Sequence, residues 1–229
     1  MRLSIIIPVY NEKNTILKIL SKIDGVFLGD IEKEIIVVDD GSDDGTREIL
    51  NNLTGKYKII FHEKNQGKGM AIRTGLKYTS GDWIIIQDAD LEYDPNDYIK
   101  LLNFAKENNA QAVYGSRTSN LKRGVMSGLI YALGGLFVTF LTNILYKTNL
   151  TDEATCYKLF KTDLIKNIPL NCERFEFCPE ITAKVAKRGI KIFEIPINYY
   201  PRHKKEGKKI NWKDGLEAIW TLIKYKFID

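Results

Sequence analysis

Short apolar runs with no polar interruption recur along the first half of the chain and alternate with segments of helical periodicity. Ile5–Ile7, Ile35–Val38 and Trp83–Ile86 are such runs, and they are typical of strands that a sheet buries on both faces. Because strands that alternate with helices build a mainly parallel sheet, the pattern predicts an α/β fold. We expect strands near residues 2–8, 34–39, 57–62, 82–88 and 111–115, and helices near 12–23, 45–53, 67–79 and 96–108.

Polar residues follow three of these predicted strands. Asp88 and Asp90 follow the third apolar run, Asp39 follows the second, and Tyr10 and Glu12 follow the first. One acidic strand end could be a simple turn, since Asp favours turns. Open α/β sheets, however, bind ligands at the carboxyl ends of their strands, and residues two apart in a strand share a face. Two carboxylates so placed suit Mg²⁺ or Mn²⁺, with substrate phosphates as the remaining ligands.

The order and spacing of several motifs resemble family 2 glycosyltransferases of the GT-A fold, which is Rossmann-like with a mainly parallel central sheet flanked by helices. The resemblance covers essentially the whole chain. Within the family the sequence is most similar to the enzymes that charge dolichyl or undecaprenyl phosphate with one sugar, such as dolichyl-phosphate mannose synthase. The matching stretches are SIIIPVYNE (4–12), IIVVDDGSDDGT (35–46), NQGKGMAIRTG (65–75), GDWIIIQDADLEYDP (81–95), YGSR (114–117), LTDEATCYKLF (150–160), FEFCPEITAKVAKRG (175–189) and YYPRHKKEGKKINWKDGL (199–216).

This resemblance implies an inverting, metal-dependent enzyme that moves one sugar from a nucleotide sugar to a polyprenyl or dolichyl phosphate. GDP-mannose is the favoured donor, and UDP-glucose or UDP-N-acetylglucosamine stays open. The implied metal ligands for Mg²⁺ or Mn²⁺ are Asp88, Asp90 and Glu92. The implied donor-binding residues are Pro8, Tyr10, Glu12, Val37, Asp39, Asp88, Ala89 and Asp90. The implied catalytic residues are Asp88, Asp90, Arg117, Arg202, Lys208 and Lys209.

The basic residues in that last set belong to a charge-rich half of the chain. Residues 1–114 hold 14 Lys and Arg against 18 Asp and Glu, whereas residues 115–229 hold 20 against 11. The stretch 202–209 carries five cations around one glycine, which indicates either a solvated loop or a clamp on phosphates. We divide the chain into a donor-binding core (1–120), hydrophobic interfacial helices (121–149) and an acceptor-side part of the same catalytic domain (150–229).

Residues 124–146 contain no charged side chain and are long enough to span a bilayer. Site residues are nevertheless expected on both flanks, and Gly134, Gly135 and Asn143 weaken a spanning helix. We therefore expect one or two interfacial helices rather than a span, with a buried helix pair as the alternative. Related sequences carry a basic residue inside this segment for the lipid phosphate, and here only Lys122 and Arg123, just before it, could substitute.

The last helical segment has an apolar stripe, and we expect this stripe to pack on the core, with a membrane-dipping face as the alternative. The stripe consists of Trp212, Leu216, Ile219, Trp220, Ile223 and Phe227. No signal peptide is expected, because Pro8, Asn11 and Glu12 interrupt the apolar start. Together these features predict a cytoplasmic protein that is peripheral on the cytosolic face of the membrane.

Other function classes lack their sequence signatures. No GxGxxG follows the first strand and no GxxxxGK[ST] occurs, which excludes a dinucleotide-binding dehydrogenase and a P-loop NTPase. Haloacid-dehalogenase-like phosphatases expect Thr or Val where Glu92 stands. The three cysteines and two histidines form no zinc set, which favours reduced, structural cysteines, and no nucleic-acid-binding motif accompanies the basic half.

The acceptor decides whether the reaction needs a general base. A lipid monophosphate is already a dianion near neutral pH, because its second ionisation lies near pH 6. A sugar or protein hydroxyl, as in cell-surface polysaccharide synthesis, would need a base, with Asp152, Glu153 or Glu180 as candidates. A non-catalytic nucleotide-sugar-binding module is a third possibility, against which the intact Asp88 and Asp90 pair argues.

Overall fold

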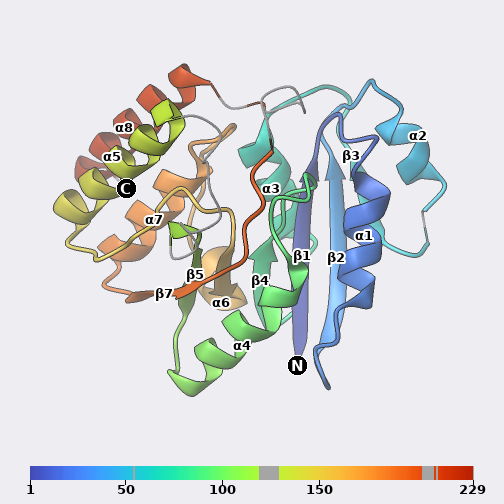
Figure 1. Cartoon of the computed structure of the whole chain (residues 1–229), viewed down its shortest axis with the longest axis horizontal. Coiled ribbons are helices and arrows are strands. Elements are labelled where there is room, and N and C mark those ends of the chain that lie inside the picture. Colours follow the sequence, from blue (N-terminus) through green and yellow to red (C-terminus); the bar gives the residue numbers. More distant parts are fainter. Residues whose placement is uncertain (54, 119–128, 203–208, 210, 229) are drawn as a thin grey trace.

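A seven-stranded sheet of order β3-β2-β1-β4-β6-β5-β7 forms the centre of the molecule in a computed structural model that describes residues 1–53, 55–118, 129–202, 209 and 211–228 (Figure 1). Neighbouring strands run parallel, except that β6 is antiparallel to both β4 and β5. The prediction of an α/β fold with a mainly parallel sheet is confirmed. The strands are β1 (Arg2–Val9), β2 (Glu32–Asp39), β3 (Lys58–Phe61), β4 (Trp83–Ile86), β5 (Ala112–Ser116), β6 (Lys158–Lys161) and β7 (Ile192–Pro196).

Helices flank this sheet, and three of them gather beside its β5–β7 end. There α5, α7 and α8 pack on one another around a small apolar core of their own, at the left in Figure 1, whereas α1 and α2 lie at the opposite end. The helices are α1 (Ile16–Gly25), α2 (Thr46–Asn51), α3 (Lys68–Lys77), α4 (Tyr98–Glu107), α5 (Leu129–Tyr146), α6 (Thr162–Lys166), α7 (Phe177–Lys187) and α8 (Trp212–Phe227). Among the described residues, no helix is long and apolar enough to cross a bilayer.

Every strand and helix predicted for the first half exists, but two boundaries differ for physical reasons. Helix α1 begins at Ile16 rather than near residue 12, because the main-chain oxygen of Glu12 first closes a turn with the amides of Thr15 and Ile16. Strand β4 ends at Ile86, so the prediction that it reaches residue 88 is wrong. Asp88 and Asp90 therefore lie together in a turn rather than on one face of a strand.

The expectation that the stripe on α8 packs on the core is wrong for most of its members. Trp212, Leu216, Trp220, Ile223 and Phe227 are exposed, and the helix instead buries Thr221, Leu222 and Tyr225 against α5 and α7. Of the predicted interfacial segment 121–149, the structure describes α5 and the residues that follow it, and residues 121–128 lie outside the described part.

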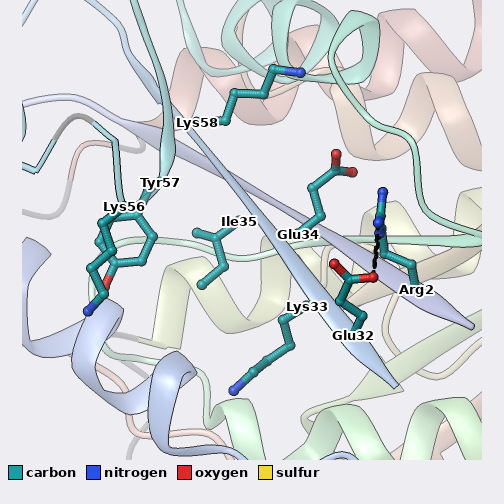
Figure 2. A pocket seen from close by; sticks show the side chains of 8 residues that line it. All are labelled: Arg2, Glu32, Lys33, Glu34, Ile35, Lys56, Tyr57 and Lys58. Carbon is teal, nitrogen blue, oxygen red and sulfur yellow. Dashed lines mark hydrogen bonds and ion pairs between the residues drawn. The ribbon is translucent and has the colours of Figure 1, made fainter. Parts of the chain in front are cut away.

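A surface hollow lies at the amino-terminal ends of β1 and β2, opposite to the strand ends that carry the acidic residues (Figure 2). Arg2 and Glu32 form an exposed ion pair of 2.9 Å at its margin. Lys33 donates hydrogen bonds to the main-chain oxygens of Ile23, Asp24 and Val26 at the end of α1. These contacts tie α1 to β2, and we assign the hollow no ligand.

Helix α3 approaches β1 so closely that only glycine fits at position 75. A Cβ built on Gly75 would lie 2.6 Å from Cγ2 of Ile6, a side chain that is itself completely buried. Gly215 in α8 has nothing within 4 Å of the corresponding position. The two glycines therefore differ in surroundings although both stand inside helices.

We expect Gly75→Ala to lower the free energy of unfolding by about 1–3 kcal/mol, because a methyl group overpacks the contact between α3 and β1. Gly215→Ala is the matched control, and it should raise stability by about 0.5–1 kcal/mol because alanine favours a helix interior. Urea denaturation followed by circular dichroism measures both. Equal effects of the two substitutions would contradict the described packing.

Candidate active site

The carboxyl ends of β1, β2 and β4 meet at one edge of the sheet, at the top of the view in Figure 1. Strand β1 pairs in parallel with both neighbours, which places Val9 opposite Asp39 and Ile6 opposite Ile86. Because of this register, the segments that follow the three strands lie side by side. The candidate site is built on those segments.

Asp88 forms an ion pair of 2.5 Å with Lys68, the first residue of α3. Burial alone would lower the pKa of Lys68, but the Asp88 carboxylate raises it well above its usual value. Gly67 precedes Lys68 with φ at +97°, and a Cβ there would collide with the main-chain oxygen of Glu173. The glycine thus lets α3 start at the place where its first residue, Lys68, contacts the acidic turn that contains Asp88 and Asp90. Lys68 was not among the predicted site residues, although its place between two glycines at a helix start was a usable signal.

Asp90 lies beside Arg202, whose guanidinium is 3.2 Å from Oδ2 of Asp90 and 3.3 Å from the carboxylate of Glu12. Burial raises the pKa of Asp90 to about 7, and the negative charges of Asp88 and Glu92 add to this shift while Arg202 opposes it. Lys209 reaches the same place, with Nζ 2.9 Å from Oε1 of Glu12. Two residues from the segment after β7 are therefore held at the edge formed by β1 and β4.

Glu92 fastens that segment to the acidic turn. Its carboxylate accepts a hydrogen bond from the Tyr199 hydroxyl at 2.7 Å and from the Arg202 amide at 2.8 Å. In this arrangement Glu92 positions Tyr199 and Arg202, and its predicted role as a metal ligand stays a prediction. Within the described part of the chain, no group of three or more His, Cys, Asp or Glu residues is arranged so that it could hold a metal ion.

Arg117 lies on the other side of Tyr199. Its guanidinium carbon is 5.2 Å from the centre of the tyrosine ring, and its Nε and Nη2 donate to the two carboxylate oxygens of Asp152, both at 2.7 Å. Burial alone would raise the pKa of Asp152, but Arg117 holds it below its usual range. Tyr199 thus has Arg117 stacked on its ring and Arg202 three residues further along the chain.

The two aspartates that end β2 have different surroundings. Asp39 is completely buried and pairs with Nε of Arg47 at 2.9 Å. Asp40 accepts hydrogen bonds from the amides of Gln66 and Gly67 and contacts Nδ1 of His62 at 2.7 Å. Asp40 therefore fixes the loop that delivers Lys68, a positioning role that the sequence did not reveal.

The remaining predicted residues are distributed as follows. The main-chain oxygen of Tyr10 accepts a hydrogen bond from Lys209, and Pro8 lies next to Val9 near the end of β1. Val37 and Ala89 are buried, with Val37 completely enclosed in the main core. Lys208, Lys122 and Arg123 lie outside the described residues.

The family model described as "Glycosyl transferase family 2" matches residues 4–168, which run from within β1 to beyond β6 and include the acidic turn. The chain belongs to glycosyl transferase family 2. The resemblance stated from the sequence motifs is thereby confirmed.

Two relatives within this family carry names that specify a reaction. The dolichol-phosphate mannosyltransferase of Pyrococcus furiosus is 29% identical over an alignment of 238 positions, which covers 99% of this chain and 65% of that protein. The UDP-N-acetylglucosamine–dolichyl-phosphate N-acetylglucosaminyltransferase of Methanococcus voltae is also 29% identical, over 97% of this chain and 95% of that protein. Both names refer to a dolichol-linked phosphate, but the first names mannose and the second N-acetylglucosamine as the sugar.

Among solved structures, the glucosyl-3-phosphoglycerate synthase of Mycobacterium tuberculosis superposes with a TM-score of 0.73 at 19% identity, covering 99% of this chain and 80% of that one. That crystal structure contains Mn²⁺, uridine diphosphate and glucosyl-3-phosphoglycerate. At this identity the likeness establishes the fold, and the predicted GT-A class is confirmed.

The three carboxylates that could serve this family 2 enzyme as a general base are all engaged within the protein. Asp152 is held by Arg117. Glu153 is fully buried, accepts a hydrogen bond from Thr182 at 3.0 Å, and has its pKa raised by burial. Glu180 accepts hydrogen bonds from the amides of Asn171 and Cys172 at 2.8 and 2.6 Å, and it pairs with Lys184.

The surroundings of Glu180 indicate a structural role, which predicts a loss of stability on substitution. Glu180→Gln should lower the free energy of unfolding by about 3–5 kcal/mol near pH 7, because Lys184 would keep a buried charge without its partner. Burial alone would raise the pKa of Glu180, but Lys184 and the amide of Asn171 hold it below its usual value. The Glu180 carboxylate therefore stabilises the fold at a pH above its usual pKa. The difference in free energy of unfolding between wild type and variant should shrink as the pH falls below about 4.

Denaturant unfolding at several pH values measures this difference. Glu107→Gln on the exposed surface of α4 is the control, with an expected change within about 0.5 kcal/mol. A Glu180→Gln variant that is as stable as wild type but inactive in glycosyl transfer would instead support a role as the base.

Proposed function

We propose that this enzyme is an inverting, metal-dependent glycosyltransferase that moves one sugar from a nucleotide sugar to a polyprenyl or dolichyl phosphate. The observation that carries the proposal is the arrangement around Tyr199. Arg117 stacks on this ring, and Arg202 reaches from the same segment to Asp90. Two guanidinium groups beside an acidic turn suit a reaction in which two phosphates approach each other. Two relatives of the chain are named for transfer to dolichyl phosphate, which supports the same acceptor.

The chemistry of the acidic turn fits Mg²⁺ or Mn²⁺. Asp88 and Asp90 offer hard carboxylate oxygens. Burial is the main cause that raises the pKa of Asp90, and the neighbouring charges of Asp88 and Glu92 add a repulsion that a divalent cation would relieve. Asp90 would hold the metal with donor diphosphate oxygens, Asp88 would support the metal or the sugar, and Glu92 is a further candidate ligand. The bound cation would neutralise the charge that develops on the leaving diphosphate.

The proposed reaction is a single in-line displacement. An acceptor phosphate oxygen forms a bond to the anomeric carbon while the bond from that carbon to the donor diphosphate breaks, and the nucleoside diphosphate leaves with the electron pair. Since the acceptor is a dianion, no proton has to be abstracted. Arg117, Arg202, Lys208 and Lys209 would hold the two phosphates close together. The engagement of Asp152, Glu153 and Glu180 within the fold is consistent with a reaction that uses no base.

Donor recognition in this proposal follows the segments after β1 and β2. Pro8, Tyr10, Glu12 and Asp39 would surround the nucleoside, with the buried Val37 supporting them from the core, and Asp39 would accept hydrogen bonds from the base or ribose. GDP-mannose is the first donor to test, as in the name of the Pyrococcus furiosus relative, and UDP-N-acetylglucosamine is the second, as in the Methanococcus voltae one. The enzyme would work in the cytoplasm as a peripheral protein on the cytosolic face of the membrane, which segment 121–149 contacts.

Asp90→Asn should lower turnover by orders of magnitude and weaken Mn²⁺ binding in the presence of nucleoside diphosphate, because an amide is a poor metal ligand. Calorimetric titration with Mn²⁺ and a radiolabelled transfer assay measure the two effects. Asp94→Asn, in the same loop, is the control, because Asp94 contacts Asn96. An Asp90→Asn variant with wild-type rate under controlled metal concentration would disprove the assignment.

The purified enzyme should transfer labelled sugar to a short polyprenyl phosphate and leave free sugars unmodified. The label is followed into the organic phase, with GDP-mannose, UDP-N-acetylglucosamine and UDP-glucose as separate donors. Transfer to hydroxyl sugars alone would overturn the lipid acceptor and support the saccharide alternative. Binding of a donor, detected by thermal shift, without transfer to any acceptor would support the non-catalytic module.

A further inference from the structure

Two neighbouring helices carry most of the large apolar side chains that the described residues expose. Ten of the sixteen belong to α5 and α8. Phe140 and Ile144 on α5 are each 59% exposed, and on α8 Trp220 is 64% and Phe227 82% exposed. The ten residues, which together we call the α5–α8 surface, are Leu133, Leu136, Phe137, Phe140, Ile144, Trp212, Leu216, Trp220, Ile223 and Phe227.

The spacing of these residues gives each helix one apolar stripe. On α8 the exposed positions follow one another at intervals of three or four residues, the repeat of a single helix face. The two helices are fixed side by side, because the Tyr146 hydroxyl donates to the main-chain oxygen of Leu222 at 2.6 Å and Lys226 donates to that of Leu145. Both helices also pack on α7, next to which they lie in Figure 1, and the stripe residues are the ones that this packing leaves exposed.

The charges beside the two stripes have one sign. The described part of α5, Leu129–Tyr146, contains no charged residue. On α8 the exposed charged residues are Lys213, Lys224 and Lys226, whereas Asp214 is buried and Glu217 is half-buried. A surface of exposed tryptophans and other large apolar groups with lysines at its border complements the interface of an anionic bilayer. In a symmetric pair of chains the same lysines would approach one another.

The α5–α8 surface begins next to the candidate active site. Lys209, whose Nζ contacts Glu12, is separated from Trp212 by two residues, a distance of at most about 11 Å along an extended chain. At the other helix, the Thr139 hydroxyl of α5 accepts a hydrogen bond from the amide of Glu153 at 3.0 Å, directly after Asp152, the partner of Arg117. Helix α8 thus follows Lys209 closely along the chain, and α5 is bonded to the segment that carries Asp152, the partner of Arg117.

We propose that the α5–α8 surface docks on an anionic lipid bilayer, with α8 inserting its tryptophan stripe beside α5. This places α8, and not only segment 121–149, at the membrane, and it sets the Arg117 and Arg202 side of the site near the headgroups. The functional reason for this docking rests on the proposed lipid-phosphate acceptor, but binding of the α5–α8 surface to a bilayer does not require that acceptor.

Sedimentation with vesicles tests the proposal directly. The full chain should bind vesicles that contain phosphatidylglycerol and bind pure phosphatidylcholine vesicles more weakly. A triple variant, Trp212→Ser with Trp220→Ser and Phe227→Ser, should need about tenfold more lipid for half-maximal binding, because its apolar contact area is removed. Phe27→Ser is the matched control, since Phe27 is 86% exposed far from α8, between α1 and β2, and it should bind like wild type.

Further measurements separate the outcomes. Circular dichroism melting should give both variants the wild-type transition, because the replaced side chains are exposed. The triple variant should transfer sugar normally to a short, water-soluble polyprenyl phosphate and lose activity on a long-chain acceptor in vesicles. Docking without transfer to any polyprenyl phosphate would contradict the proposed function and leave the membrane proposal intact.

Two results would overturn the membrane proposal. One is equal vesicle binding by wild type and triple variant, or no binding by either. The other is a wild-type dimer in light scattering that the triple variant converts to monomers without any vesicle binding, which would assign the surface to a second copy of the chain.

Discussion

Crowded negative charge at one edge of the sheet is the constraint on which the site depends. The parallel register of β1, β2 and β4 brings Glu12, Asp88, Asp90 and Glu92 close together, and buried like charges are unfavourable unless cations neutralise them. The cations come from distant segments, Lys68 from the start of α3 and Arg202 and Lys209 from the segment after β7. Charge neutralisation therefore holds the segment after β7 against the strand ends of the first half of the chain.

Main-chain contacts complete this closure and limit which residues are tolerated. The amide of Gly69 donates to the carbonyl of Arg174, and Gly67 leaves room for the backbone of Glu173. Asp40 holds the same loop from the other side through the amides of Gln66 and Gly67. Lys68 is thus positioned by Asp40 from the first half of the chain and by the backbone at residues 173–174 from the second half. A small shift of either segment would move the ion pair between Lys68 and Asp88.

The sequence was most informative where buried strands impose a simple pattern. Uniform apolar runs located β1, β2 and β4, and the polar residues after them located the acidic edge. The same reasoning missed β6 and β7. Strand β6 has only four residues, with a lysine at each end (Lys158 and Lys161), and the second half of the chain has no apolar strand run like those of the first half. The same reasoning also missed Lys68 and Asp40, since an ion pair between α3 and the turn after β4 depends on tertiary packing. The stripe on α8 was visible, but spacing alone does not show which side of a helix the fold covers.

The proposed chemistry and the position of α8 follow from one distribution of charge. An acceptor that is already a dianion removes the need for a base but adds a second negative group beside the donor diphosphate, so the site must supply positive charge instead. Arg117, Arg202 and Lys209 supply it on the side from which α5 and α8 continue. The lysines of α8 extend that positive charge along the border of an apolar surface. A lipid phosphate would then meet favourable potential first at the bilayer interface and afterwards at the arginines, so that binding to the membrane and binding of the acceptor are guided by the same sign of charge.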